Sequence, residues 1–343
     1  MNRKIAVIGG GAAGLEASSA LASLGFRVVL VEKEDETGGH IKNWHALFPN
    51  RRPGTEVLQA LRSKLSKEVE LFSGKTVTEI KQVQGRFEVG SADGWKAEAD
   101  AVLLTTGFSL FNASKKEEYG YGIYDNVITS ADLESAFSAG KITMKNGEQP
   151  KRIGFVHCVG SRDEKAGNIY CSKVCCVTAV KQAIEVKQFL PECEVFCFYM
   201  DMRMFGRHYE ELYKEAQEKY YIQFIRGRLS ESTEDHTGKI ILKVEDTLLG
   251  KPLKIGVDML VLMVGMESPD ITRKLGSELG LLNDSDRFLV SADQHISANV
   301  SEIPGLFFAG TCTGPKNIAD TLADARSAAL AIAGYFENNS NRS

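Results

Sequence analysis

The stretch KIAVIGGGAAGLEASSALASLGFRVVLVE, residues 4–32, decides the fold of this chain. The apolar run Lys4–Ile8 predicts a buried strand, the three glycines after it predict a tight turn, and the segment up to about residue 24 predicts a helix. Arg27–Val31 predicts a second strand. A strand, a glycine turn, a helix and a second strand together form the opening unit of a dinucleotide-binding fold.

The spaced glycines Gly9-x-Gly11-x-x-Gly14 each have a physical role in such a turn. Gly9 permits the tight turn, Gly11 lets the backbone approach a pyrophosphate, and Gly14 lets the helix lie against the strand. The helix N-terminus offers free N–H groups and a partial positive charge to the phosphates. Glu32, at the end of the second strand, is placed to accept hydrogen bonds from a ribose and disfavours a 2′-phosphate. The motif predicts a bound dinucleotide without distinguishing FAD from NAD.

Length and composition indicate how many domains to expect and which kinds of binding partner are excluded. A chain of 343 residues is too long for one compact core of ordinary size, so we expect two domains. The net charge of -4 gives no excess of basic residues for binding nucleic acid or an anionic membrane. The longest strongly apolar stretch, residues 259–266, is far shorter than the roughly 20 residues of a membrane helix, so we expect no transmembrane segment.

The N-terminal apolar run is also too short for the core of a signal peptide, so we expect a cytoplasmic protein. In that compartment the seven cysteines stay reduced, and clustered cysteines are better interpreted as metal-binding or redox-active than as structural disulfides.

The rest of the pattern predicts two α/β units, the second inserted into the first. In the first unit the later segments are an antiparallel meander over 69–72, 76–83 and 86–89, strands at 100–105, 288–291 and 306–309, and a helix at 318–336. In the second they are strands at 153–157, 194–199 and 258–264, a hairpin pair at 240–244 and 253–255, and helices at 173–189 and 209–221. We therefore place one discontinuous domain at 1–112 and 280–343 and the insert at 113–279. The tail 338–343 is expected to be disordered.

Four of the seven cysteines, Cys158, Cys171, Cys175 and Cys176, lie within residues 158–176. They stand where a nicotinamide-binding glycine loop would follow the first strand of the insert, and no Gly-x-Gly-x-x-Gly occurs there. Four thiolates can hold zinc or an iron–sulfur cluster. Zinc sites favour paired Cys-x(2–4)-Cys knuckles, whereas a cubane offers adjacent cysteines separate irons, and a helix N-terminus favours a negatively charged cluster.

The spacing therefore favours a cluster, with zinc, a redox dithiol and an inert core as alternatives. The remaining cysteines, Cys193, Cys197 and Cys312, are interpreted as buried packing residues.

Three further segments carry a family resemblance: Gly38-Gly39 after Glu32, Thr105-Thr106-Gly107 at a strand end, and IPGLFFAG at 303–310 before the last helix. Together with the glycine turn they resemble the flavoproteins of the thioredoxin reductase and glutathione reductase type. The resemblance implies an α/β fold with two Rossmann-like dinucleotide-binding domains and an antiparallel β-meander, with FAD as the ligand. It implies a flavin site made of Gly9, Gly11, Ala12, Ala13, Gly14, Glu32, Lys33, Gly38, Gly39, His40, Val77, Thr106, Gly107, Gly310, Thr311, Lys316, Asn317 and Ile318.

This chain departs from the family at Thr311, where relatives usually have an aspartate that binds the ribityl chain. Lys316 is a candidate catalytic residue that stabilises anionic reduced flavin, although a solvated surface lysine is an equal alternative. N–H groups near Asn317 and Ile318 could face the flavin C2 carbonyl. Less specific candidates are Trp44 and His45 beside the flavin ring, and Asp201 and Arg203 where relatives bind a nicotinamide phosphate.

A closer resemblance lies in the segments CVGSRDE, YCSKVCC, AVKQAIEVK, FGRHYEELYKEAQE and PKNIADT. They resemble the A subunit of heterodisulfide reductase, in the minimal form of the heterodisulfide-reductase-like complexes of sulfur-oxidising bacteria. The A subunit of quinone-interacting oxidoreductase is a related protein. In that family the cysteines matching Cys158, Cys171, Cys175 and Cys176 bind one [4Fe-4S] cluster. The extra ferredoxin-type Cys-x2-Cys-x2-Cys motifs of methanogen subunits do not occur in this sequence.

The resemblance implies an electron-transfer subunit that contains FAD and a [4Fe-4S] cluster, works with other subunits in sulfur metabolism, and forms a homodimer. Two other hypotheses stay open. One is an NADPH-dependent disulfide reductase using Cys175 and Cys176, which suffers from the missing second glycine motif and from the strain of a disulfide between adjacent cysteines. The other is a non-catalytic scaffold in which FAD is only structural.

Overall fold

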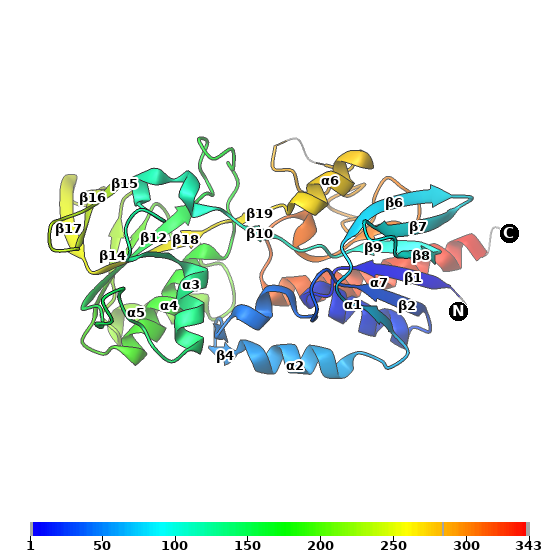
Figure 1. Ribbon diagram of the computed structural model, residues 1–343, viewed down its shortest axis with the longest axis horizontal. Helices are drawn as coiled ribbons and strands as arrows, with labels where there is room; N and C mark the ends of the chain where they lie inside the picture. The colour runs from blue at the N-terminus through cyan, green and yellow to red at the C-terminus, as the bar shows by residue number, and fades with distance from the viewer. Residues whose placement is uncertain (1–2, 283–284, 341–343) are drawn as a thin grey trace. The chain divides into compact units, whose positions relative to one another are not determined.

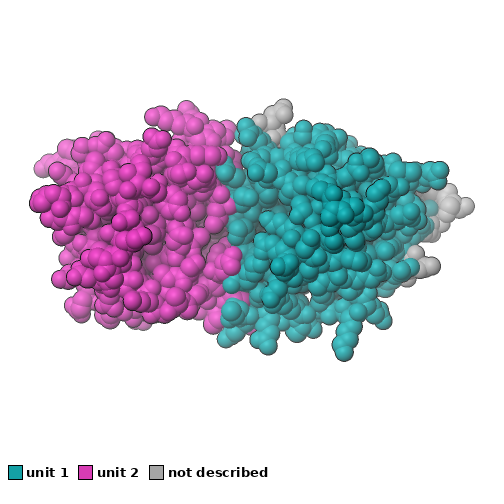
Figure 2. Space-filling model, viewed as in Figure 1, with its two compact units in different colours: residues 1–42, 55–109, 267–343 teal, residues 43–54, 110–266 magenta. Residues whose placement is uncertain are grey.

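The computed structural model describes residues 3–282 and 285–340 (Figure 1). The chain forms two compact units (Figure 2). Unit 1 comprises residues 1–42, 55–109 and 267–343, and unit 2 comprises residues 43–54 and 110–266. The sequence pattern places the insert at 113–279. The unit found in the structure ends at Met266 and also includes residues 43–54, so the helix α6, Asp270–Glu278, groups with unit 1.

Unit 1 is built on a five-stranded parallel sheet with the strand order β20-β9-β1-β2-β5. Its strands are β1 Lys4–Ile8, β2 Arg27–Val31, β5 Glu70–Phe72, β9 Ala101–Leu104 and β20 Leu306–Phe308. The antiparallel meander consists of β6 Val77–Val83, β7 Arg86–Ser91 and β8 Lys96–Ala99. The other helices of this unit are α1 Ala12–Ser23, α2 Gly54–Lys64 and α7 Ile318–Ser340.

The parallel sheet of unit 1 is covered on both faces, which explains why its strands are continuous apolar runs. Alternate side chains such as Ala6 and Ile8 share one core with the meander residues Phe87 and Val89. The helices α1 and α7 pack against one another, and both contact strands of the sheet. The glycine turn therefore joins a strand of this sheet to α1, as the sequence predicts.

Unit 2 repeats this plan around a parallel sheet with the order β11-β18-β12-β13-β14. Its strands are β11 Val127–Thr129, β12 Arg152–Val159, β13 Glu194–Tyr199, β14 Gln223–Arg226 and β18 Met259–Val264. An antiparallel sheet contains β15 Leu229–Glu234, β16 Ile240–Asp246 and β17 Lys251–Val257. The helices are α3 Ser130–Ser138, α4 Cys175–Phe189 and α5 Tyr209–Glu218.

Alternation along the strands of unit 2 divides their side chains between two cores. On one face Phe155 and Val261 pack with residues of α3, α4 and α5. On the other face Phe198 and Leu260 pack with residues of the antiparallel sheet such as Leu242.

The shorter elements complete the chain. They are the 3₁₀ helices η1 Gly39–Asn43, η2 Ala113–Lys115, η3 Glu117–Tyr119 and η4 Gly310–Thr313, and the strands β3 Ala46–Leu47, β4 Arg52–Pro53, β10 Ser109–Leu110 and β19 Met266–Glu267.

A buried charge network holds α3, α4 and residues 43–54 together within unit 2. The ammonium of Lys181 contacts Glu134, lies 3.0 Å from a carboxylate oxygen of Glu185, and donates to the Ala46 carbonyl at 2.9 Å. Glu134 also accepts the backbone N–H of His45 at 2.9 Å. One lysine therefore forms ion pairs with two carboxylates. Burial raises the pKa of Glu185 to about 7.

Some expected elements need correction. The segment 69–72 supplies β5 of the parallel sheet rather than a strand of the meander, whose third strand is β8. Residues 288–291 form no strand, although Leu289 makes an isolated bridge to Leu282. The helix expected at 173–189 begins at Cys175, because Lys173 has a φ of 60°, which an α-helix does not accommodate.

The C-terminal expectation is also partly wrong. The helix α7 continues to Ser340, so residues 338–340 are helical rather than disordered, and 341–343 lie outside the described residues. Within the described part of the chain, no helix combines the length and the apolar character needed to cross a membrane.

Candidate functional site

The glycines in the turn of unit 1 are explained by two physical requirements, close backbone packing at two positions and open space at the third. A Cβ at Gly9, whose φ is 111°, would lie 2.5 Å from the Thr105 carbonyl oxygen, and a Cβ at Gly14 would lie 1.8 Å from the Gly9 carbonyl oxygen. Both positions are therefore fixed by backbone packing. Gly11 has an ordinary φ of -75°, and the nearest described atom to its Cβ position, chain neighbours apart, is the Gly39 Cα at 3.9 Å. The space over Gly11 is open, as the approach of a pyrophosphate requires.

Glu32 is buried at the end of β2 and holds this turn. One carboxylate oxygen accepts the Gly10 N–H at 2.6 Å and the other accepts the Glu34 N–H at 2.9 Å. Each oxygen has further lone pairs, so the same carboxylate can order the turn and still accept a ribose hydroxyl. The neighbouring Lys33 is exposed.

Gly38 and Gly39 lie beside the same turn. The Gly38 N–H donates to the Gly10 carbonyl at 2.8 Å, and both glycines have positive φ angles, of 129° and 53°. His40 follows them in η1. A ring nitrogen of His40 lies 2.9 Å from the Phe108 carbonyl oxygen and the two rings stack, while burial lowers the pKa of His40 and favours its neutral form.

The segment after β9 closes the other side of the turn. The Thr105 hydroxyl lies 2.8 Å from the Gly9 carbonyl oxygen and 3.0 Å from that of Ile8, and Thr106 accepts a hydrogen bond of 2.6 Å from the Thr272 hydroxyl. Gly107 has a φ of 75°, and no described atom outside its chain neighbours lies within 4 Å of its Cβ position. By contrast Val77, at the start of β6, buries its side chain in the core.

The segment Gly310–Thr313 lies against the start of α1. A Cβ at Gly310 would stand 2.8 Å from the Ala13 Cβ, and the residue before it, Ala12, opens the helix. The Gly310 N–H donates to the carboxylate of Asp324 on α7 at 2.8 Å. Thr311 is buried within this segment.

Lys316 is not a solvated surface lysine. Its ammonium donates to the Gly310 carbonyl at 2.9 Å and to the Thr313 hydroxyl at 2.6 Å, and it lies 3.5 Å from Asp324. Asn317 accepts the N–H of residue 320 at 2.8 Å and so caps α7, whose first residue is Ile318.

Unit 1 thus brings together most of the predicted flavin residues around one turn. Lys33 and Val77 contribute no side chain to it, and Trp44 and His45 belong to unit 2. Sequence reasoning missed Asp324, whose carboxylate accepts the Gly310 N–H.

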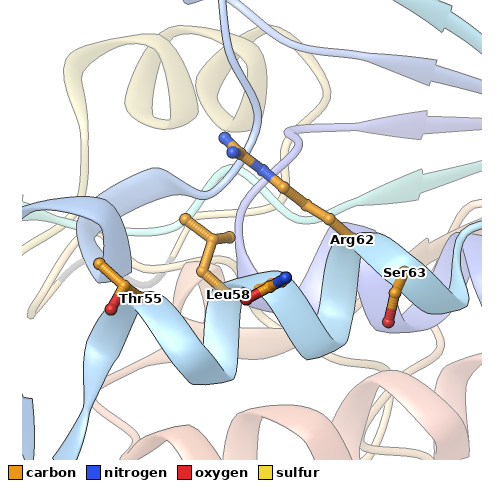
Figure 3. A pocket seen from close by; sticks show the side chains of 5 residues that line it. Thr55, Leu58, Arg62 and Ser63 are labelled. Carbon is orange, nitrogen blue, oxygen red and sulfur yellow. The ribbon is translucent and has the colours of Figure 1, made fainter.

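A hollow lies along α2 on the same unit, and its lining residue Leu58 packs against Gly38 (Figure 3). It is lined by Thr55, Leu58, Gln59, Arg62 and Ser63. None of these residues is among the predicted flavin residues.

The cysteines of unit 2 lie at a strand end and at a helix start. Cys158 is near the end of β12, and Cys175 and Cys176 open α4. Interactions with Cys158 and Cys176, together with burial, raise the pKa of the Cys175 thiol, and the interaction with Cys175 lowers the pKa values of Cys158 and Cys176. The Cys176 sulfur also lies 3.7 Å from the Asp201 carbonyl oxygen. Three of the four predicted ligands are therefore neighbours.

Cys171 stands on the loop between β12 and α4 and is half-buried. Its sulfur accepts the Lys173 N–H at 3.3 Å. Across the described residues, no group of three or more His, Cys, Asp or Glu side chains is arranged to hold a metal ion. The other cysteines, Cys193, Cys197 and Cys312, are buried, and burial raises the pKa of each.

Buried polar atoms without partners gather around the cysteines. The Ser161 hydroxyl and the Nη1 of Arg162 are buried without a hydrogen-bond partner among the described residues. Neither ring nitrogen of His157 makes a hydrogen bond of normal geometry, although this ring interacts with the Cys176 thiol. Such atoms are rare because each costs about 1–3 kcal/mol. Cys158 and Arg162 also have positive φ angles, of 60° and 53°, which are uncommon outside glycine and concentrate at functional sites. A sulfur-rich group that accepts hydrogen bonds fits these surroundings.

Comparison with known proteins agrees with this description. Residues 3–146 match the family described as pyridine nucleotide-disulphide oxidoreductase. The A subunit of the H(2)/formate:CoB-CoM heterodisulfide,ferredoxin reductase of Methanococcus maripaludis is 43% identical, over 68% of this chain and 36% of that one. The first of two iron-sulfur A subunits of the CoB-CoM heterodisulfide reductase of Methanopyrus kandleri is 31% identical, over 96% of this chain and 63% of that one. The chain thus spans between about a third and two thirds of the length of these curated relatives.

Solved structures agree on the fold. Thioredoxin reductase of Lactococcus lactis has a TM-score of 0.68 at 18% identity, with 97% of this chain and 99% of that one covered. Thioredoxin reductase of T. acidophilum has a TM-score of 0.67 at 20% identity, with 98% and 99% covered. The predicted fold class, two Rossmann-like units with an antiparallel meander, is confirmed.

Proposed function

The chain is a relative of the heterodisulfide reductase A subunits with a thioredoxin-reductase-like fold, and from this premise we propose a flavin-dependent oxidoreductase subunit. In this proposal unit 1 binds FAD, unit 2 binds one [4Fe-4S] cluster, and electrons pass between the two cofactors and other subunits of a heterodisulfide-reductase-like complex. The observation that carries the proposal is the meeting of Cys158, Cys175 and Cys176 where a nicotinamide-binding glycine loop would otherwise stand.

The residues of unit 1 fit FAD. The open backbone at Gly11 and the N-terminus of α1 would receive the pyrophosphate, and Glu32 would accept the ribose hydroxyls. Lys316, held by the Gly310 carbonyl, would keep a positive charge at the start of α7. Bound FAD supplies two-electron chemistry that can be divided into single electrons.

In this proposal the four clustered cysteines of unit 2 supply the thiolates for the cluster. Cys158, Cys175 and Cys176 would each bind one iron, and Cys171 would supply the fourth thiolate from its half-buried position on the loop. The lowered pKa values of Cys158 and Cys176 support this role, because thiolates are the ligating form. The start of α4 would add a partial positive charge beside the negatively charged group.

The alternative of a disulfide reductase using Cys175 and Cys176 is less well supported. The relatives named above are heterodisulfide reductase A subunits, and the sulfur of Cys158 joins the pair as a third member. We further propose a homodimer that works in the cytoplasm in sulfur metabolism, on the basis of the resemblance to the minimal subunits of sulfur-oxidising complexes.

The ligand assignment is tested by replacing one central cysteine and one matched buried cysteine. Cys175→Ser should lose the iron and the visible absorbance of the cluster while keeping FAD, because the two sites lie in different units. Cys193→Ser, which alters a cysteine of similar burial away from the site, should keep both. Iron and flavin are measured on anaerobically reconstituted protein. Stoichiometric iron in Cys175→Ser would refute the assignment.

A further inference from the structure

Arg162 connects the chain segments that carry the cysteines of unit 2. It follows Cys158 by four positions, and its backbone N–H donates to the carbonyl of Tyr170 at 2.9 Å. Tyr170 is the residue before Cys171. The backbone of Arg162 therefore ties the end of β12 to the loop that presents Cys171.

The side chain of Arg162 reaches the third segment. Its Nη2 donates to a carboxylate oxygen of Asp201 at 2.7 Å, and the Asp201 carbonyl oxygen lies 3.7 Å from the Cys176 sulfur. Asp201 also lies 3.5 Å from the guanidinium of Arg226. One carboxylate thus meets two guanidinium groups, which leaves a net positive charge beside the cysteines.

The other terminal nitrogen of Arg162, Nη1, makes no such hydrogen bond. This nitrogen is buried and has no hydrogen-bond partner among the described residues, while the side chain as a whole is only 21% exposed. Although burial opposes it, the bond to Asp201 and the charges of Cys158 and Cys171 raise the pKa of Arg162. The charged guanidinium therefore has one terminal nitrogen, with its two N–H groups, left without a partner in the field of two of the proposed ligands.

We propose that Arg162 donates a hydrogen bond from Nη1 to a sulfur of the cluster and thereby raises the reduction potential of the cluster. This inference rests on the proposed function. Reduction adds one negative charge, and a fixed positive charge with an N–H···S bond stabilises the more negative state. Arg162 is thus a positioning residue that also sets the potential, and it acts whichever partner supplies the electron.

The test is a potentiometric titration of the anaerobically reconstituted protein, followed by EPR of the reduced cluster. Arg162→Gln removes the charge and the fork of donors. At a fixed poise near the wild-type midpoint it should lower the ratio of reduced to oxidised cluster by about tenfold. Arg226→Gln is the matched control, because Arg226 contacts the same Asp201 from a more exposed position and should change the ratio by less than about twofold.

Each result decides the inference. Full iron content in Arg162→Gln with the potential of the control would overturn it. If Arg162→Gln fails to take up iron, the titration is repeated with Arg162→Lys, which keeps the positive charge but lacks the Nη1 donor. A lowered potential in Arg162→Lys supports the inference and a wild-type potential overturns it. Wild-type protein that takes up no iron would instead refute the proposed function.

Discussion

Gly11→Ala should separate flavin binding from folding. The backbone at Gly11 is extended, with a φ of -75° and a ψ of -165°, and an alanine Cβ there would stand 3.9 Å from the nearest described atom outside its chain neighbours. The substitution therefore costs the apoprotein no more than about 0.5 kcal/mol. That corresponds to a change in melting temperature of about 1–2 °C for a unit of this size.

In the proposed function, the same Cβ would occupy the space through which the pyrophosphate of FAD reaches the N–H groups at the start of α1. Losing hydrogen bonds to a charged group costs about 1.5–3 kcal/mol, which weakens FAD binding by about 10- to 150-fold. Gly14→Ala is the contrasting variant, because its Cβ would lie 1.8 Å from the Gly9 carbonyl oxygen. The turn and the helix must then separate, which lowers the stability of the apoprotein itself by about 1–3 kcal/mol.

The assay uses deflavinated protein, with thermal unfolding for stability and quenching of flavin fluorescence for the dissociation constant of FAD. The expected pattern is an unchanged melting temperature with weak binding in Gly11→Ala, and a lowered melting temperature in Gly14→Ala. Wild-type affinity in Gly11→Ala would show that the pyrophosphate does not pass over this residue, and the account of the flavin site would be refuted.

Two further predictions concern the buried charges of unit 2. The pKa of Glu185 is raised from 4.5 to about 7, so the folded protein holds the extra proton between these values. Protonation of Glu185 therefore adds its full contribution to the free energy of unfolding below about pH 4.5. The free energy of unfolding falls by about 3 kcal/mol as the pH rises to about 7, and this group causes no further change at higher pH. Urea unfolding across this range should show the decline in the wild type, and the same slope in Glu185→Gln would exclude Glu185 as its source. Lys181→Met leaves Glu134 and Glu185 without their shared cation and should cost about 3–5 kcal/mol in the same assay, whereas a loss below about 1 kcal/mol would show that the network is not structurally important.

The glycine turn of unit 1 could be predicted from the sequence because its residues are constrained by local backbone geometry. Gly9 and Gly14 face backbone oxygens at distances that no side chain tolerates, and such constraints appear directly in the spacing of the glycines. The carboxylate of Asp324 could not be found in this way. It reaches the Gly310 N–H only because α7 lies against the segment Gly310–Thr313, and that packing is a tertiary property.

Strand pairing was predicted less well than strand position. The segment that became β5 has the right length and composition for a strand, but periodicity alone does not say whether it joins a parallel sheet or a meander. The strand β8 was missed because its sequence KAEA is poor in β-branched and aromatic residues.

The arrangement of the cysteines could be predicted from the sequence only in part. The proximity of Cys158 to Cys175 and Cys176 follows from a strand, a loop and a helix in an α/β unit, since the end of the strand and the start of the helix lie at the same edge of the sheet. The placement of Cys171 and the role of Arg162 depend on the loop conformation, including the left-handed φ of 53° at Arg162, which the sequence does not reveal.

The most direct test of the whole account is an anaerobic analysis of iron, sulfide and flavin in the purified protein, with EPR after dithionite reduction. The account predicts about four irons and four sulfides for each FAD, together with the signal of a reduced cluster. One FAD with no iron after anaerobic reconstitution would contradict it, and would direct attention to Cys175 and Cys176 as a dithiol of a disulfide reductase.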